Sequence, residues 1–244
     1  MAGIITPNLM VVGKMGSGKS HYLKTVLEDA ISRDAFEYLV VLNTSREFSE
    51  FCTAKEEMTL ERLSRGYSAA QLAAFIRLNR KVHFEVPECD EMFPFLDALG
   101  EAMMSLGQYD ADGCTVLFLC DEAHVFMPKN NYVRGLKRLD TEGRKYGVLS
   151  IKATQTLVGM GGFAIHHTPI RAANYWVVFP TSEVNSRKRI AETLGEIPDP
   201  ANYAMPDREK GWGPEYFVFD GRENVRGLMR RQSDGSRRYE EVRA

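Results

Sequence analysis

The feature that most constrains this chain is the segment of residues 13–20, which reads Gly-Lys-Met-Gly-Ser-Gly-Lys-Ser. It matches the pattern G-x-x-x-x-G-K-[S/T] in full, follows an apolar run typical of a strand, and opens a helical pattern. Such a loop turns its backbone N–H groups onto phosphate oxygens, and the helix adds the positive end of its dipole. We therefore expect ATP to bind here. The expected contacts are Gly13, Lys14, Met15, Gly16, Ser17, Gly18, Lys19, Ser20 and His21.

Two side chains of this loop have expected roles in chemistry. Lys19 is placed to reach the β and γ phosphates, where its charge assists phosphoryl transfer. Ser20 has a hydroxyl at the position that ligates Mg²⁺ in such loops, and the charge of that ion offsets the negative charge that develops during transfer. The loop therefore predicts a site for ATP and Mg²⁺ together.

Two adjacent acids, Asp121 and Glu122, follow the apolar run of residues 115–120. The run predicts a buried strand, and ligands bind at the carboxyl ends of strands in open α/β sheets. We expect Asp121 to hold the magnesium ion, directly or through water, and Glu122 to orient and polarise the attacking water as a base. A second acid beside the metal ligand favours hydrolysis over simple nucleotide binding.

The fold class follows from the order of the predicted elements. Short apolar runs rich in β-branched and aromatic residues alternate with longer helical patterns, which indicates βαβ units and a mostly parallel sheet. We predict an α/β, RecA-like three-layer sandwich over residues 1–221, with a C-terminal strand and basic tail over 222–244. Strands are expected at 9–13, 38–43, 81–86, 115–121, 148–154 and 175–179, and helices at 19–31, 69–78, 91–106, 132–146 and 183–194. A hairpin can form through 216–219 and 224–229.

Gln155 is the next candidate for the site. It follows the strand predicted after the one that ends in Asp121 and Glu122. In a RecA-like sheet that strand lies beside the phosphate-loop strand, so the amide of Gln155 can hydrogen-bond the γ-phosphate or the attacking water. The alternative is that Gln155 only caps the strand.

The histidines carry less information. His124, beside the acids, can sense the nucleotide or can be a hydrogen-bonded structural residue, and the sequence leaves both open. His166 and His167 are adjacent but lack further ligands at metal-binding spacing, so no chemistry is assigned to them.

Four segments together resemble the HerA/FtsK superfamily of DNA-pumping ATPases: GKMGSGKS, LFLCDEAH, EGRKYGVLSIKATQT and IRAANYWVVFP. The likeness spans residues 8–195. The stretch from Glu142 to Gln155 is its most specific part, because many NTPase families share the first two segments. DEAH also occurs in superfamily 2 helicases, but these need a second RecA-like domain that 244 residues cannot supply.

The resemblance implies a ring, usually a hexamer, with ATP at the subunit interfaces and double-stranded DNA in the pore. An arginine from the neighbouring subunit completes each site. Larger members carry membrane spans or an N-terminal barrel, and this sequence shows neither, so it looks most like the compact genome-packaging ATPases of membrane-containing icosahedral viruses. A capsid or portal protein is then an expected partner, and the expected location is cytoplasmic, in a host cell or associated with a virion.

Basic residues supply candidates for the DNA contact and for the trans arginine. On one predicted helix the residues that share a face are Arg134, Lys137, Arg138 and Lys145, which can bind phosphates without reading sequence or can form a solvated face. For the trans arginine we rank Arg144 first, followed by Arg171 and Arg187. A second basic group comprises Arg222, Arg226, Arg230, Arg231, Arg237 and Arg238.

Composition leaves three functions open. Lys and Arg total 31 against 33 Asp and Glu, a net charge of −2, so no global charge argues for DNA and any basic site must be local. The four cysteines lack zinc spacing and are expected to be reduced, and no stretch approaches the ~20 apolar residues of a membrane span.

The first hypothesis is a DNA translocase. The others are an ATPase that drives assembly or secretion of a protein partner without DNA, and a P-loop kinase, which Glu122 and Gln155 argue against.

Overall fold

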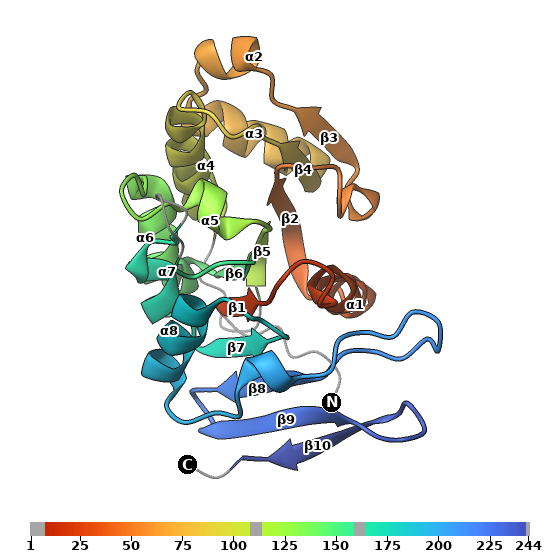
Figure 1. Ribbon diagram of the computed structural model, residues 1–244. Coiled ribbons are helices and arrows are strands. Elements are labelled where there is room, and N and C mark those ends of the chain that lie inside the picture. The colour runs from red at the N-terminus through yellow and green to blue at the C-terminus, as the bar shows by residue number, and fades with distance from the viewer. Residues whose placement is uncertain (1–7, 108–113, 159–163, 243–244) are drawn as a thin grey trace.

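The computed structural model describes residues 8–107, 114–158 and 164–242 (Figure 1). Its strands are β1 (Leu9–Val12), β2 (Phe36–Asn43), β3 (Ala54–Glu57), β4 (Lys81–Glu85), β5 (Cys114–Cys120), β6 (Val148–Thr154), β7 (Tyr175–Val178), β8 (Tyr216–Asp220), β9 (Val225–Arg231) and β10 (Arg237–Glu241). Its helices are α1 (Lys19–Ser32), α2 (Leu60–Ser64), α3 (Ala69–Asn79), α4 (Met92–Leu106), α5 (Ala123–Phe126), α6 (Arg134–Glu142), α7 (His167–Ala172) and α8 (Val184–Leu194). Short 3₁₀ turns are η1 (Ser49–Phe51), η2 (Gly143–Tyr146) and η3 (Pro200–Asn202).

Within the described residues the strands form one sheet of 10, in the order β10-β9-β8-β7-β1-β6-β5-β2-β4-β3. The strands from β7 to β3 in this order are mutually parallel, whereas β8, β9 and β10 add an antiparallel extension at the β7 side. The predicted α/β class with a mostly parallel sheet is confirmed. Strand β1 lies between β6 and β7, so the phosphate loop emerges from the middle of the sheet.

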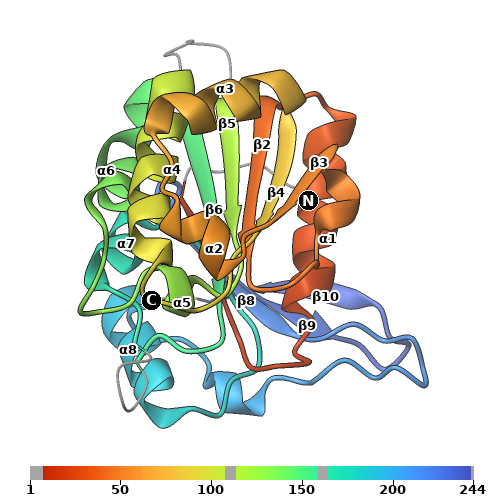
Figure 2. The same ribbon diagram turned by 90° about the horizontal axis from the view of Figure 1, so that it is seen from above.

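Strand β1 is apolar at every position, and its neighbours are mostly apolar, because helices cover both faces of the sheet (Figure 2). Along β1, Met10 and Val12 belong to one hydrophobic core and Leu9 and Val11 to another, as the two-residue period of a strand requires. The second core contains the buried residues of α1. The first contains those of α3, α4, α6 and α8. The result is a three-layer sandwich.

Helices α4 and α6 meet backbone to backbone. A Cβ atom on Gly100 would lie 2.3 Å from the carbonyl carbon of Gly135, and one on Gly135 would lie 2.1 Å from the Asp97 carbonyl oxygen. The Asp97 carboxylate accepts a hydrogen bond of 2.6 Å from the Gly135 N–H. Only glycine at positions 100 and 135 allows this close approach. The contact holds α6 against α4, in the helix layer that covers one face of the sheet.

A buried ion pair ties α6 to the sheet. Lys152 Nζ in β6 lies 2.5 Å from Asp140 Oδ1 in α6, and the two side chains are 2% and 0% exposed. Lys152 also donates to Ser150 Oγ at 2.6 Å, and Tyr132 Oη donates to Asp140 Oδ2 at 2.5 Å. Buried charges need such partners, so this cluster constrains how α6 sits on β6. The sequence pattern did not predict it.

Several local predictions were wrong. The helix predicted over 132–146 is α6 followed by η2, so Lys145 is not on the helical face of Arg134. The helix predicted over 183–194 begins one residue later as α8, and its N-cap is Glu183, whose carboxylate accepts from the Asn185 and Ser186 N–H groups. Strand β3 was missed because its sequence, AKEE, is largely charged, as suits an edge strand. The basic tail, for which only one strand was predicted within 222–244, contributes a second strand, β10, since its backbone pairs with β9.

The two predicted segments, 1–221 and 222–244, contribute strands to the same sheet. Strands β9 and β10, from the C-terminal segment of 222–244, continue the sheet that begins with β8. The predicted hairpin is confirmed as β8 and β9. No helix in the described part of the chain has the length and apolar character needed to cross a bilayer.

Candidate nucleotide-binding and hydrolysis site

The phosphate loop is tied to both neighbouring strands. The Gly13 N–H donates to the Thr154 carbonyl at 3.2 Å, and the Lys14 N–H donates to the Pro180 carbonyl at 3.0 Å. A Cβ on Gly13 would lie 2.5 Å from the Phe179 Cβ, so the loop can pass this point only as glycine. Gly16 and Gly18 have φ values of 72° and 100°, in the left-handed region that glycine adopts without strain. The expected strand, loop and helix arrangement is therefore present.

Lys19 lies inside this loop. Its side chain is buried, and Nζ donates to the carbonyls of Gly13 at 2.7 Å and Lys14 at 3.2 Å. Burial lowers the pKa of Lys19, and the nearby carboxylates of Glu122 and Asp121 partly offset this. Ser17 Oγ is buried beside it without a hydrogen-bond partner among the described residues. The loop thus holds a cation and an unsatisfied polar atom where phosphate oxygens are expected to bind.

The first acid lies at the carboxyl end of β5, close to the loop. Asp121 is 6% exposed and accepts a hydrogen bond of 3.3 Å from Asn43 Nδ2 at the end of β2. Burial and the neighbouring Glu122 raise the pKa of Asp121 to about 6. Asn43 was not among the predicted site residues, although a polar residue ending an apolar strand was a usable signal.

The oxygen atoms near this carboxylate suit magnesium. Asp121 and the Ser20 hydroxyl are hard oxygen ligands, which Mg²⁺ prefers. No group of three or more His, Cys, Asp or Glu side chains placed to hold a metal occurs in residues 8–107, 114–158 and 164–242. The site therefore fits an ion that takes its remaining ligands from phosphates and water, and does not fit a resident metal held by the protein alone.

Gln155 and His124 both lie against the carboxylate of Glu122. Gln155 Nε2 donates to Glu122 Oε1 at 2.5 Å, and His124 Nδ1 lies 3.3 Å from Glu122 Oε2 and 3.2 Å from Thr154 Oγ1. Glu122 has φ 54°, a conformation that non-glycine residues adopt mainly where the surroundings impose it. The structure therefore bonds Gln155 to the acid Glu122, a contact that the sequence did not predict, and places His124 beside Glu122.

The state of His124 follows from its surroundings. Burial lowers the pKa of His124, although the carboxylate of Glu122 acts in the opposite direction. The ring is then neutral at neutral pH, with one nitrogen able to donate and the other to accept. His124 therefore lies beside the Glu122 carboxylate without adding a charge, and its hydrogen-bond partner is Thr154 Oγ1.

The remaining predicted residues lie outside this cluster. His21 is exposed on the first turn of α1. Arg144 is exposed on η2, before β6, at the edge of the sheet opposite to the phosphate loop, and so does not reach the site of its own chain. Arg171 is exposed, whereas Arg187 pairs with Asp199 at 2.7 Å. Arg138 pairs with Glu101 at 2.6 Å. Of the four cations predicted to share a helix face, it is therefore the least available for a DNA contact.

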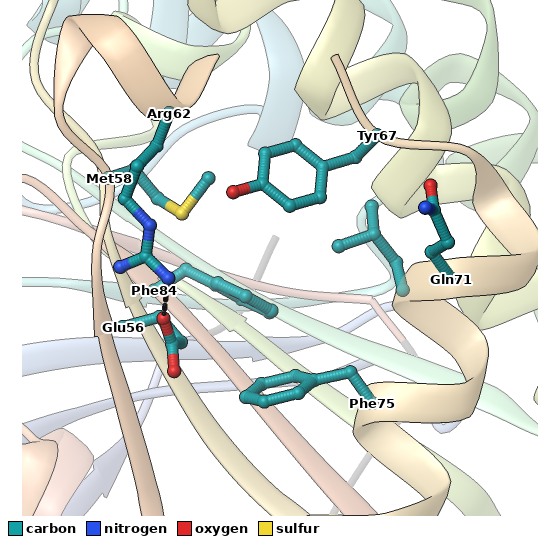
Figure 3. Close-up of a pocket in the computed structure, with 8 residues that line it drawn as sticks. Glu56, Met58, Arg62, Tyr67, Gln71, Phe75 and Phe84 are labelled. Carbon is teal, nitrogen blue, oxygen red and sulfur yellow. Dashed lines mark hydrogen bonds and ion pairs between the residues drawn. The ribbon is translucent and has the colours of Figure 1, made fainter. Parts of the chain in front are cut away.

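A separate hollow lies at the far edge of the sheet, among β3, β4, α2 and α3 (Figure 3). It encloses about 240 Å³, its walls are mainly aromatic and aliphatic, and an ion pair of Arg62 with Glu56 closes one side. It shares no residue with the phosphate loop or with the acids after β5. The candidate nucleotide site therefore lies at the carboxyl ends of the central strands, and this hollow is not part of it.

Comparisons with known proteins give matches at the level of structure. No protein-family model and no curated protein sequence matches the chain. The genome packaging NTPase B204 from Sulfolobus turreted icosahedral virus 2, in complex with ATP-gammaS, is 14% identical at a TM-score of 0.63, over 93% of this chain and 98% of that one. Thermomonospora curvata EccC (ATPases 2 and 3), in complex with a signal sequence peptide, is 14% identical at a TM-score of 0.53. The match covers 98% of this chain and 37% of that one.

A third match is the bacterial conjugative coupling protein TrwBdeltaN70, at 12% identity and a TM-score of 0.54, over 97% of this chain and 77% of that one. At such identities the likeness establishes a shared fold. The predicted RecA-like fold is therefore confirmed, and these neighbours agree with the resemblance seen in the sequence.

Proposed function

We propose that this chain is an ATPase that forms a ring and moves double-stranded DNA, with the packaging of a viral genome as its task. The observation that carries the ATPase part is the convergence of the phosphate loop, Asp121, Glu122 and Gln155 at the carboxyl ends of β1, β5 and β6. The viral part is supported by the packaging NTPase, which matches over nearly the full length of both chains.

The chemistry follows from the positions of the side chains. The loop N–H groups and Lys19 bind the phosphates, while Asp121 and Ser20 would hold magnesium, which supplies neutralising charge to the phosphates. Glu122 accepts a proton from the water that attacks the γ-phosphorus, and the bond from that phosphorus to the bridging oxygen breaks. Gln155, bonded to Glu122 at 2.5 Å, orients the same water. Asp121, Glu122 and Gln155 follow the ends of the parallel strands β5 and β6, while Lys19 and Ser20 begin α1 directly after the phosphate loop.

DNA binding is assigned to exposed cations near α6. Arg134 and Lys137 on the helix and Lys145 on η2 are exposed, and no carboxylate lies within 4.0 Å of them among the described residues. Repeated around a hexamer, a few such charges per subunit bind the phosphate backbone without reading sequence. The net charge of −2 does not oppose this, because the contact is local.

The deciding measurement is steady-state ATP hydrolysis by the purified protein with and without linear double-stranded DNA. We expect DNA to stimulate turnover severalfold, and the stimulation to weaken as salt rises, because salt competes for the phosphate contacts. A Glu122→Gln variant controls for contaminating ATPases. An ATP turnover rate that does not change when DNA is added at low salt would contradict the proposal of a DNA translocase. It would favour an ATPase that acts on a protein partner.

A trans arginine is expected to complete each site, and Arg144 is our first candidate. Because it lies at the sheet edge opposite to its own phosphate loop, it can act only on the nucleotide of a neighbouring subunit. We expect Arg144→Ala to lower the kcat of the assembled protein by about 10³-fold while ATP still binds. Arg65→Ala, an exposed arginine on the far side of the sheet, serves as the control. Unchanged turnover in Arg144→Ala would exclude Arg144 as the trans arginine, and Arg171 and then Arg187 would be tested in the same way.

The second candidate function is an ATPase that drives assembly or secretion of a protein partner without DNA. It is favoured by the near-neutral charge and by EccC, a secretion ATPase solved with a signal sequence peptide. Both functions use the same hydrolysis site, so only the response to DNA or to a protein separates them. For the packaging function a capsid or portal protein in the host cytoplasm or the virion is the proposed partner.

A further inference from the structure

Two hairpin-like segments lie together beside the phosphate loop. The loop between η3 and β8 is closed by a bridge between Asp207 and Trp212, and the turn between β9 and β10 contacts it. A Cβ on Gly235, in that turn, would lie 2.2 Å from the indole Nε1 of Trp212. In Figure 2 both segments extend along the side on which α1 begins. The C-terminal extension therefore forms a wall next to the start of α1.

This wall touches the phosphate loop directly. A Cβ on Gly18, the residue that precedes α1, would lie 2.8 Å from Pro214 Cγ. The Tyr216 ring lies 5.7 Å from the ring of Tyr22 in α1 and 5.1 Å from the ring of Phe179 after β7. These contacts place Pro214 and Tyr216 on the side of the loop where Ser20 and His21 continue into α1.

Arg237 lies on top of this wall. Its guanidinium carbon is 5.5 Å from the centre of the Tyr216 ring and 3.4 Å from where a Cβ on Gly213 would lie. The side chain is exposed, and within the described residues no carboxylate lies within 4.0 Å of it. Its cross-strand partner is Arg231, a like charge that bonds to the Met205 carbonyl at 3.0 Å. Facing arginines destabilise a strand pair, so the arrangement calls for another reason.

We propose that Arg237 binds the base of the nucleotide whose phosphates occupy residues 13–20, by stacking its guanidinium on the purine ring. Tyr216 and Gly213 lie against the guanidinium, and an exposed planar cation held in this way can stack on a base. The inference rests on the proposed function, because it assigns the base subsite of the same ATP. It makes β10 part of the nucleotide site, although it lies at the far end of the chain.

The test compares binding of a non-hydrolysable ATP analogue with binding of inorganic tripolyphosphate, both measured by calorimetry with magnesium. Stacking of one base contributes about 1–3 kcal/mol, so Arg237→Ala should weaken the analogue by about 5-fold to 150-fold. Tripolyphosphate has no base, and its affinity should not change. Arg237→Lys keeps the charge but loses the plane, and it should behave like Arg237→Ala for the analogue.

The control is Arg238→Ala. Arg238 is the next residue of β10, is also exposed, and points to the opposite face of the strand, so its removal should leave both affinities unchanged. Equal loss of analogue and tripolyphosphate in Arg237→Ala would overturn base stacking in favour of a phosphate contact. If wild type binds and hydrolyses ATP while Arg237→Ala binds the analogue as tightly, this inference alone fails. A wild-type protein that binds neither ligand would overturn the proposed function.

Discussion

Replacing Glu122 by glutamine is expected to lower the kcat of ATP hydrolysis by about 10²-fold to 10⁴-fold, the usual contribution of a positioned general base. Glutamine has nearly the same shape, so the contacts with Gln155 and His124 can persist, but the amide cannot accept the proton of the attacking water. The loss of a negative charge beside Asp121 should also lower the pKa of that carboxyl, since the charge of Glu122 is the largest cause, after burial, that raises it. Steady-state phosphate release measures the effect.

Binding separates this effect from damage to the site. The affinity of Glu122→Gln for ATP should stay within a few-fold of wild type, because the loop and Lys19 hold the phosphates. Glu196→Gln, at an exposed position after α8, provides the matched control and should hydrolyse ATP normally. Turnover of Glu122→Gln within about three-fold of wild type would exclude Glu122 as the base, since general-base losses are far larger.

Breaking the buried ion pair is expected to have the largest effect on stability. Lys152→Met leaves the carboxylate of Asp140 buried without its cation, and such changes cost about 3–5 kcal/mol of the free energy of unfolding. Urea unfolding followed by circular dichroism measures the loss. Lys145→Met, at an exposed lysine, should change the same quantity by less than about 0.5 kcal/mol.

The double variant Lys152→Met with Asp140→Leu distinguishes the pair from the packing around it. Removing both charges eliminates the unpaired carboxylate, and apolar replacements of buried pairs are often neutral. Tyr132 Oη keeps a partner in the Leu136 carbonyl at 3.0 Å. The double variant should therefore recover most of the stability that Lys152→Met loses. A double variant as unstable as the single one would show that the ion pair is not the cause.

Much of the fold could be predicted from short-range patterns. The central strands are apolar at successive positions because both sheet faces are covered, and this pattern is visible without the structure. The edge strand β3 and the tail strand β10 carry mostly charged residues, so only pairing with β4 and β9 makes them strands. Within 132–146 the α-helix ends at Glu142 and is followed by η2, a change that the helical pattern of the sequence did not predict.

The sequence by itself determined the phosphate loop and the two acids after β5. Their chemistry is local: neighbouring residues in one loop, or directly after one strand, need only that loop and strand to form. Tertiary structure alone decided that Gln155 bonds to Glu122, that Glu101 pairs with Arg138, and that Arg237 of β10 lies near Tyr216, which contacts Tyr22 in α1. These contacts join residues far apart in the chain, and they depend on strand order and helix packing. No local pattern encodes that order, because it results from burying all the apolar faces together.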